Sequence, residues 1–400
     1  MENIIKDFKK SRLFVLYILG FIFAFTSAIP AYVNSSFLKN LTNEHVIGFI
    51  YIIGAIINLC ALMIIPKILK RFGNYRVTLF STILYFFSFI GIVFFQNIFL
   101  VLFCFVMTGM MASIIYFNLD VFIEHDSLNN EVGGIRGIYL TCINLAWLFS
   151  PWIAGEIVGI SSFKHIYVAT AIIMIPVILL FYFKLNNFID PEYKTYNIFE
   201  TIKTVFKTRD IKDIIISSYL LQFFFALMVI YTPIYLNEYI GFGWEEIGII
   251  FTVMLIPFIL VQVPLGRLAD KKFGEKGMLE IGFIIMGIST AVIPFIHSKS
   301  IIIWAFVLFM TRVGAAMAEL MNDTYFFKKV NDKNLNLINM YRMGAPVSYI
   351  IAPAIAMLVL YFLPIQNIFF FLALMMVWGL KDSSHLRDTN VAESKILIKL

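Results

Sequence analysis

Twelve long apolar runs are the feature of this sequence that most restricts its fold. A helix that rises 1.5 Å per residue needs about 20 residues to cross about 30 Å of hydrocarbon. Runs of about this length occupy residues 13–33, 46–65, 77–95, 98–119, 137–157, 166–183, 214–236, 247–265, 279–294, 301–322, 337–360 and 364–380. Buried helices of a soluble protein would need polar faces that these runs lack. The sequence therefore predicts an all-α integral membrane protein.

The composition excludes a soluble globular domain. Hydrophobic residues make up 60% of the 400 residues, and charged residues only 14%. An ordinary soluble core does not need so large an apolar fraction. The net charge of +6 could suggest a nucleic-acid partner, but the basic residues lie in short segments between the apolar runs. We therefore expect a lipid bilayer as partner and no nucleic acid.

Residues that could support enzymatic chemistry are scarce. The three cysteines, Cys60, Cys104 and Cys142, all fall inside apolar runs and lack metal-ligand spacing. The sequence has no hydrolase elbow, phosphate-binding loop or nucleotide fingerprint. We expect neither an enzyme, nor a cofactor, nor a metal site, and transport is the simpler hypothesis.

Lysine and arginine predict the orientation of the chain in the membrane. They are concentrated at both ends of the sequence and in the segments that follow even-numbered runs. The opposite segments contain only Lys39, Lys164 and Lys299. Cytoplasmic loops carry an excess of these residues, so both termini are expected in the cytoplasm and the chain in the plasma (inner) membrane.

A short basic motif joins the eighth and ninth runs. It reads Gly-Arg-Leu-Ala-Asp-Lys-Lys-Phe-Gly-Glu-Lys over residues 266–276. The pattern Gly-x-Leu-Ala-Asp-x-x-x-Gly-x-Lys resembles the loop signature of the major facilitator superfamily (MFS). In that family the signature recurs after the second and eighth transmembrane helices, at the cytoplasmic gate. This copy has one residue more than the commonest form between the aspartate and the second glycine.

The two halves of the sequence repeat one another. Residues 108–120 match residues 311–323 at an offset of 203, and Phe72-Gly73 match Phe273-Gly274 at an offset of 201. Internal duplication of six helices is usual in secondary transporters, with the binding site between the halves. The first copy of the loop departs from the pattern, since Leu69 stands where Asp270 stands in the second.

The resemblance implies two pseudo-symmetric six-helix bundles around a central cavity. We expect an N-terminal bundle at residues 1–183, a cytoplasmic linker with a short amphipathic helix at 184–213, a C-terminal bundle at 214–380 and a cytoplasmic tail at 381–400. It also implies a small-molecule substrate that is moved by alternating access. We expect the protein to be a monomer.

The cytoplasmic gate can be assigned through the same resemblance. The implied gate residues are Gly266, Arg267, Asp270, Lys271, Gly274 and Asp323, with Asp120, Arg136 and Arg71 in the first half. Asp270 is expected to cap the fifth helix near residues 135–137, because helix N-termini attract carboxylates. Lys271 or Arg267 is expected to pair with Asp323.

The tenth run carries charged residues at membrane depth. Arg312 lies about 16 Å along a helix that starts near residue 301, close to the bilayer centre. Glu319 and Asp323 follow at spacings that place all three on one helix face. An arginine at this depth costs at least about 2–3 kcal/mol unless it faces a partner or a wet cavity. The repeat aligns Arg312 with Gly109 and Glu319 with Tyr116, so these two charges occur in one half only.

The resemblance places the tenth helix, with the first, fourth and seventh, around the central cavity. The candidate residues for a substrate or ion cavity are Arg312, Glu319, Tyr116, Asn118 and Asn144. The alternative for the charges is a structural ion pair, for instance Glu319 with Arg342 of the next helix.

Two function hypotheses follow from these observations. The first is a secondary transporter driven by H⁺, with Glu319 as the candidate proton carrier and export by antiport slightly favoured over uptake. The second is an MFS-like sensor or membrane scaffold that moves no solute. The C-half gate motif supports transport, whereas the incomplete N-half loop supports the second hypothesis.

Overall fold

The computed structural model describes residues 2–126, 132–186, 188, 190, 198–260, 274–330 and 335–386, and these contain helices and turns but no strand. The first half comprises α1 (Glu2–Ala31), α2 (Asn34–Leu41), α3 (Glu44–Phe72), α4 (Asn74–Phe94), α5 (Ile98–Asp126), α6 (Val132–Ile160) and α7 (Phe163–Lys184). The second half comprises α8 (Ile198–Lys207), α9 (Arg209–Ile234), the π-helix η1 (Tyr235–Ile240), α10 (Trp244–Leu255), α11 (Pro257–Leu260), α13 (Gly274–Val292), the 3₁₀-helix η3 (Ile293–Phe295), α14 (Ile301–Lys329), α15 (Leu335–Arg342), α16 (Gly344–Phe362) and α17 (Asn367–Ser384).

Every apolar run of the sequence contains helix in the structure. Among the described residues, ten helices are long and apolar enough to cross a membrane. The runs outside these ten are the eighth, where α10 has only 12 residues, and the twelfth, where α17 ends in the polar residues 381–384. The eleventh run, expected as one helix, is divided into α15 and α16 at Met343. Pro346 explains the break, because a proline at the start of a helix has no N–H to continue the preceding one.

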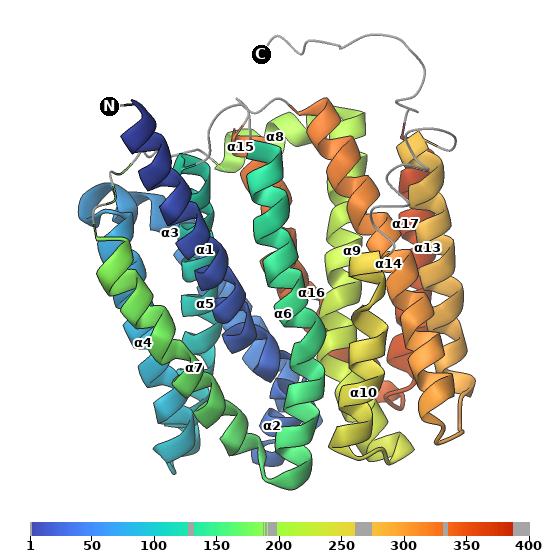
Figure 1. The fold of residues 1–400 in the computed structure, drawn as a ribbon. Helices are drawn as coiled ribbons and strands as arrows, with labels where there is room; N and C mark the ends of the chain where they lie inside the picture. The colour runs from blue at the N-terminus through green and yellow to red at the C-terminus, as the bar shows by residue number, and fades with distance from the viewer. Residues whose placement is uncertain are drawn as a thin grey trace.

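The helices form two bundles that lie side by side (Figure 1). In the first bundle α1 packs on α6 and α7, while α4 packs on α5 and α7. In the second bundle α13 packs on α14 and α17, while α9 packs on α16 and α17. The bundles meet along two helix pairs, α6 with α10 and α3 with α16.

Glycines allow the two bundles to approach closely at the end of the molecule where α2 lies. A Cβ added at Gly155 of α6 would lie 2.5 Å from the Trp244 carbonyl oxygen and 2.9 Å from the Gly248 Cα of α10. A Cβ added at Gly48 of α3 would lie 2.6 Å from Met357 Cγ of α16. Small residues at such crossings let helix backbones pack together in a membrane.

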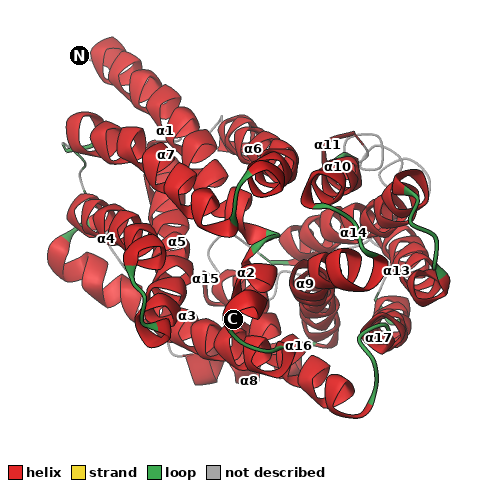
Figure 2. Cartoon of the chain, turned by 90° about the horizontal axis from the view of Figure 1, so that it is seen from below, coloured by secondary structure: helices red, strands yellow, loops and turns green. Residues whose placement is uncertain are grey.

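Helix α2 adds to this closure. It contacts α9, and Figure 2, which views the bundle from this end, shows it beside α9 and α16. Lys39 of α2 forms an ion pair with Glu238 of η1. The ring centroids of Tyr32, just after α1, and Phe251 of α10 are 5.0 Å apart. The halves are therefore joined by backbone packing, a ring contact and an ion pair at the α2 end.

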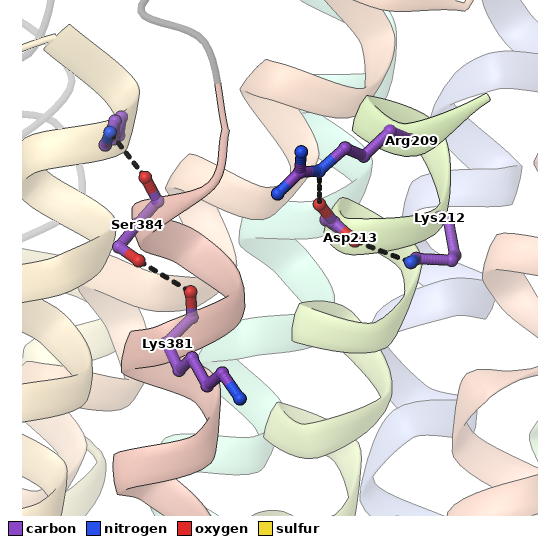
Figure 3. Close-up of polar contacts among 6 residues, drawn as sticks. Arg209, Lys212, Asp213, Lys381 and Ser384 are labelled. Carbon is purple, nitrogen blue, oxygen red and sulfur yellow. Dashed lines mark hydrogen bonds and ion pairs between the residues drawn. The ribbon is translucent and has the colours of Figure 1, made fainter.

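The opposite end holds the start of α1 together with α8 and α15 (Figure 1). Here Arg342 of α15 contacts Asp120 of α5 in the other half, at 3.3 Å between Nη1 and Oδ2. Figure 3 shows a second group at this end, where Arg209 and Lys212 flank the buried Asp213 at 3.7 and 3.4 Å. This group belongs to α9 and lies within the second half.

The outer faces of the bundles carry large apolar side chains. Phe99 on α5 and Ile302 on α14 are 78% and 81% exposed, and many other phenylalanines, leucines and isoleucines are similarly accessible. Apolar surface on this scale identifies a membrane-contacting protein rather than a soluble monomer.

Candidate functional site

Arg312 of α14 lies at the interface between the two halves. Its side chain is 1% exposed. The guanidinium carbon lies over two rings of α9, at 5.3 Å from the Phe224 centroid and 5.4 Å from the Phe225 centroid. Such cation–π contacts stabilise a desolvated arginine by about 2 kcal/mol. They offset part of the cost of holding this charge at membrane depth.

Among the described residues, two N–H groups of Arg312 lack a hydrogen-bond acceptor despite these ring contacts. Within the described part of the chain, its Nε and Nη1 atoms are buried and have no acceptor. Tyr32, from the other half, is within interaction distance of the guanidinium group, and Tyr349 of α16 and Glu319 lie close enough to interact electrostatically. A buried charged donor without an acceptor is costly, and it marks Arg312 as a candidate for ligand binding.

Tyr32 and Tyr349, which lie near this arginine, belong to a cluster of aromatic rings from both halves. Tyr51 of α3 and Tyr349 of α16 face each other across the halves, with ring centroids 6.2 Å apart. Tyr32 also contacts Trp147 of α6 at 6.5 Å and Phe251 of α10 at 5.0 Å. The region around Arg312 is thus an aromatic cluster with a single cation in contact with it among the described residues.

Glu319 and Asp323 continue the charged face of α14 toward the α15 end. Glu319 is partly buried and interacts electrostatically with both Asp323 and Arg312. Asp323 accepts a hydrogen bond of 2.6 Å from the Tyr341 hydroxyl of α15. The three residues form a row of ionisable groups from the middle of the helix to the end where α8 lies.

The repeat partners of this row lie on α5. Gly109, the partner of Arg312, is exposed, and a Cβ added there would meet no described heavy atom within 4 Å. Tyr116, the partner of Glu319, shares a hydrogen bond of 2.6 Å with Ser27 and packs on Phe23, at 4.8 Å between ring centroids. Tyr116 is therefore directed toward α1 of its own half.

Asp120, the partner of Asp323, connects the halves. Its carboxylate accepts from Arg342 at 3.3 Å. The alternative in which Arg342 balances Glu319 is wrong, because the ion pair that Arg342 makes is with Asp120.

Asn118 and Asn144 are not among the contacts of Arg312. Asn118 is wholly buried, and its backbone carbonyl oxygen accepts from Asn74 Nδ2 of α4 at 3.1 Å. Asn144 lies partly buried on α6. The repeat and the hydropathy pattern indicate depth in the membrane, but they do not indicate which bundle a polar side chain faces.

Much of the expected gate lies outside the described residues. This holds for Gly266, Arg267, Asp270 and Lys271, and for the side chain of Arg136. Gly274 is described and has a φ of +69°, close to the +81° of its repeat partner Gly73. Only glycine adopts this backbone region at little cost. Arg71 is exposed, with its guanidinium carbon 5.2 Å from the ring centroid of Phe72.

Asp190, in the connection between the halves, supplies a carboxylate at the N-terminus of α4. Its Oδ1 atom accepts from the backbone N–H of Asn74 at 2.6 Å, and its Oδ2 atom would lie 2.6 Å from a Cβ on Gly73. Helix N-termini favour such an anion. Leu69, in the last turn of α3, stands where Asp270 stands in the second copy of the motif. The structure places another acid, 116 residues beyond Asn74, beside Gly73 between α3 and α4. Local sequence carries no signal for this contact.

Phe188 holds the same segment against the first half. Its ring centroid lies 4.4 Å from that of Phe122 and 4.8 Å from that of His125, both on α5. The Arg12 guanidinium carbon of α1 lies 5.3 Å from the same ring. Leu185, Phe188 and Asp190 together form what we call the docked linker segment.

Comparisons with known proteins agree on the class. The sequence matches the family model of the Major Facilitator Superfamily over residues 15–245 and 214–380. The chain therefore belongs to the major facilitator superfamily of membrane transporters. It is a multi-pass, non-enzymatic transporter of a small molecule with an all-helical MFS fold.

Two solved structures share this fold. A bacterial homologue of the human lysosomal transporter Spinster, inward-facing and unoccupied, has a TM-score of 0.68 and 11% identity, covering 94% of this chain and 95% of that chain. A mutant of the nucleoside transporter NupG has a TM-score of 0.73 and 13% identity, covering 93% of this chain and 99% of that chain. A search of curated proteins found no match. Within the described ranges no group of three His, Cys, Asp or Glu residues could hold a metal ion.

Proposed function

We propose that this transporter exports a small solute across the plasma membrane in exchange for protons. The observation that carries the proposal is the row Arg312, Glu319 and Asp323 on α14. It begins at a buried cation between the two halves and leads to the end where α8 lies. Charges at membrane depth mark solute and proton pathways in transporters. One half alone carries Arg312 and Glu319, which favours a specific task over shared architecture.

Contacts between the halves differ in strength at the two ends. At the α2 end the backbones of α6 and α10 are in close contact through Gly155 and Gly248. Among the described residues of the α8 end, Asp120 and Arg342 form an ion pair between the halves, and their side chains are 34% and 41% exposed. An exposed ion pair contributes about 0–1 kcal/mol. The described contacts between the halves are thus closer at the α2 end than at the α8 end, and this asymmetry supports the proposal of alternating access by rocking of the halves.

Glu319 is the proposed proton carrier. Its carboxylate interacts electrostatically with the guanidinium group of Arg312, seven residues before it. When Glu319 is ionised it competes with other anions for Arg312, and when it is protonated this competition ends. Protonation of Glu319 thus changes how strongly Arg312 binds an anionic solute. This dependence couples proton binding to solute binding.

The α8 end is assigned to the cytoplasm. Support comes from the lysine and arginine distribution, since only Lys39, Lys164 and Lys299 lie in the segments of the opposite side. A cysteine in place of Lys207 on α8 should react with an impermeant maleimide in inside-out vesicles, and one in place of Asn40 should not. The reverse pattern would overturn the orientation. The native cysteines are removed in both variants.

Export and proton coupling are tested in the same vesicles. Inside-out vesicles with an acidic lumen are incubated in a small-molecule extract of the cells, and their contents are identified by mass spectrometry. Wild-type vesicles should accumulate at least one compound only while the pH gradient lasts. Glu319→Gln should lose this accumulation and still exchange labelled for unlabelled compound, because exchange needs no net proton movement. Glu156→Gln, on α6 near the α2 end, is the matched control.

Two outcomes would contradict the proposal. Gradient-driven accumulation at the wild-type level in Glu319→Gln would remove this residue from proton coupling. Vesicles that accumulate nothing, although they contain folded protein, would favour the sensor or scaffold hypothesis instead.

A further inference from the structure

We infer that Arg312 and the rings around it bind an organic monoanion, a carboxylate attached to a flat aromatic body. The inference rests on the proposed function in one respect, because it takes the interface at Arg312 as the solute site. It goes further by naming the chemical class of the solute.

Ring contacts hold the guanidinium group of Arg312, which leaves N–H donors for a ligand. Phe224 and Phe225 lie against it at 5.3 and 5.4 Å. The five N–H groups of arginine need hydrogen-bond acceptors, which ring contacts do not replace. Nε and Nη1 have no acceptor among the described residues. A planar fork of N–H donors matches the two oxygens of a carboxylate.

Charge excludes the other ligand classes. A cation would be repelled by Arg312, by several kcal/mol at 4 Å in a partly buried site. A neutral ligand would leave the buried Nε and Nη1 donors without a charged acceptor. A dianion such as a phosphate monoester would need a second cation, and the described contacts of Arg312 include none. A single negative charge fits this environment.

Rings from both halves favour an aromatic body. Tyr32 and Tyr51 come from the first half and Tyr349 from the second, and Trp147 lies beside Tyr32. Aromatic side chains bind flat apolar groups by offset or edge-to-face contact. Solute sites are mostly apolar, with a few polar groups that orient the ligand. Tyr32 is within interaction distance of Arg312, so a carboxylate there would contact both halves at once.

Open space lies at the depth of Arg312 on the opposite half. Gly109 is the repeat partner of Arg312, and no described atom would meet a Cβ built on it within 4 Å. It shares its helix face with Asp120, eleven residues on, which reaches Arg342 of the other half. Gly109 therefore lies on the face of α5 that carries Tyr116 and Asp120, and our inference places the ligand in the open space beside it.

The test measures binding to the purified full-length protein in detergent, without any gradient. The probes are benzoate, 1-naphthoate and indole-3-acetate, each compared with its neutral amide by calorimetry and thermal melting. At least one acid should bind and raise the Tm with concentration, whereas its amide should not. Arg312→Met should weaken binding at least about tenfold, since hydrogen bonds to a charged group are lost. Arg312→Lys should weaken it less.

Two further variants keep the test informative if Arg312→Met does not fold. Gly109→Phe should melt near the wild-type temperature without ligand, because space is open there, yet lose binding of the acid. Tyr32→Phe should weaken binding by about threefold or more through the loss of one hydroxyl donor. Arg209→Met, at the exposed start of α9, is the control and should bind as the wild type does.

The inference is overturned if none of the acids binds, if the amides bind equally, or if Gly109→Phe retains full affinity. These results can be separated from a failure of the proposed function. Gradient-driven export without acid binding would refute the solute class alone. Acid binding without any export would refute the transport proposal and leave the binding site in place.

Discussion

Positions 109 and 312 show how one duplicated helix acquired two different roles. Glycine on α5 leaves open space, whereas arginine on α14 places a cation beside the same interface. Hydropathy and the repeat were enough to predict that Arg312 is an asymmetric charge at depth. They could not predict its contacts with Phe224, Phe225 and Tyr32, because these depend on how separate helices pack. For the same reason the sequence does not determine which helices surround the buried side chain of Asn118.

The glycines at the interface allow a matched prediction at this scale. Gly109→Ala should stabilise the protein by about 0.5–1 kcal/mol, since alanine favours helix and nothing obstructs its Cβ. Gly155→Ala should destabilise it by about 1–3 kcal/mol, because its Cβ would collide with backbone atoms of α10. Thermal melting of the purified variants should therefore move in opposite directions. A similar shift for both would mean that the helices do not cross as closely as described.

Single elements show where local sequence determines structure and where it does not. The apolar runs predicted the transmembrane helices, and the proline at position 346 explains why α15 and α16 are separate. The position of the docked linker segment could not be predicted. Asp190 meets the start of α4 across 116 residues of sequence, and only the folded first half brings the two together.

The docked linker segment yields a double-mutant prediction. Asp190→Asn keeps the size of the side chain but removes its charge, and it should cost about 0.5–1 kcal/mol of stability at the α4 N-terminus. Gly73→Ala should cost more, since its φ of +81° is strained for alanine and its Cβ would meet the Asp190 carboxylate. Both changes disturb the same contact, so the double variant should lose less stability than the two single variants lose together.

The matched control for this cycle is Gly274→Ala. Its φ of +69° imposes a similar backbone penalty at the repeat position in the other half. When Gly274→Ala is combined with Asp190→Asn, the loss of stability should equal the sum of the two single losses within about 0.5 kcal/mol. If the melting temperatures show additive losses for Asp190→Asn and Gly73→Ala, Asp190 does not stabilise the start of α4.

At the scale of the whole molecule, the repeat and the twelve runs predicted two bundles of six helices, and the family match and the fold confirm the class. Which end of the molecule is closed could not be predicted. The states of an alternating-access protein differ by only a few kcal/mol, and local sequence patterns do not resolve such differences. In the structure, glycine contacts between α6 and α10 and between α3 and α16 hold the halves together at the α2 end.

The central claim is that Arg312 serves transport and not folding, and export from a defined set of variants tests it most directly. Arg312→Ala, Glu319→Ala and the double variant are compared with wild type in inside-out vesicles, with protein amount and melting temperature measured alongside. We expect Arg312→Ala to reach the membrane and melt as a folded protein, yet to accumulate no compound, and the double variant to remain inactive. Accumulation at the wild-type level in Arg312→Ala would contradict the claim. So would recovery of both transport and stability in the double variant, because removing both members of a purely structural ion pair costs less than removing one.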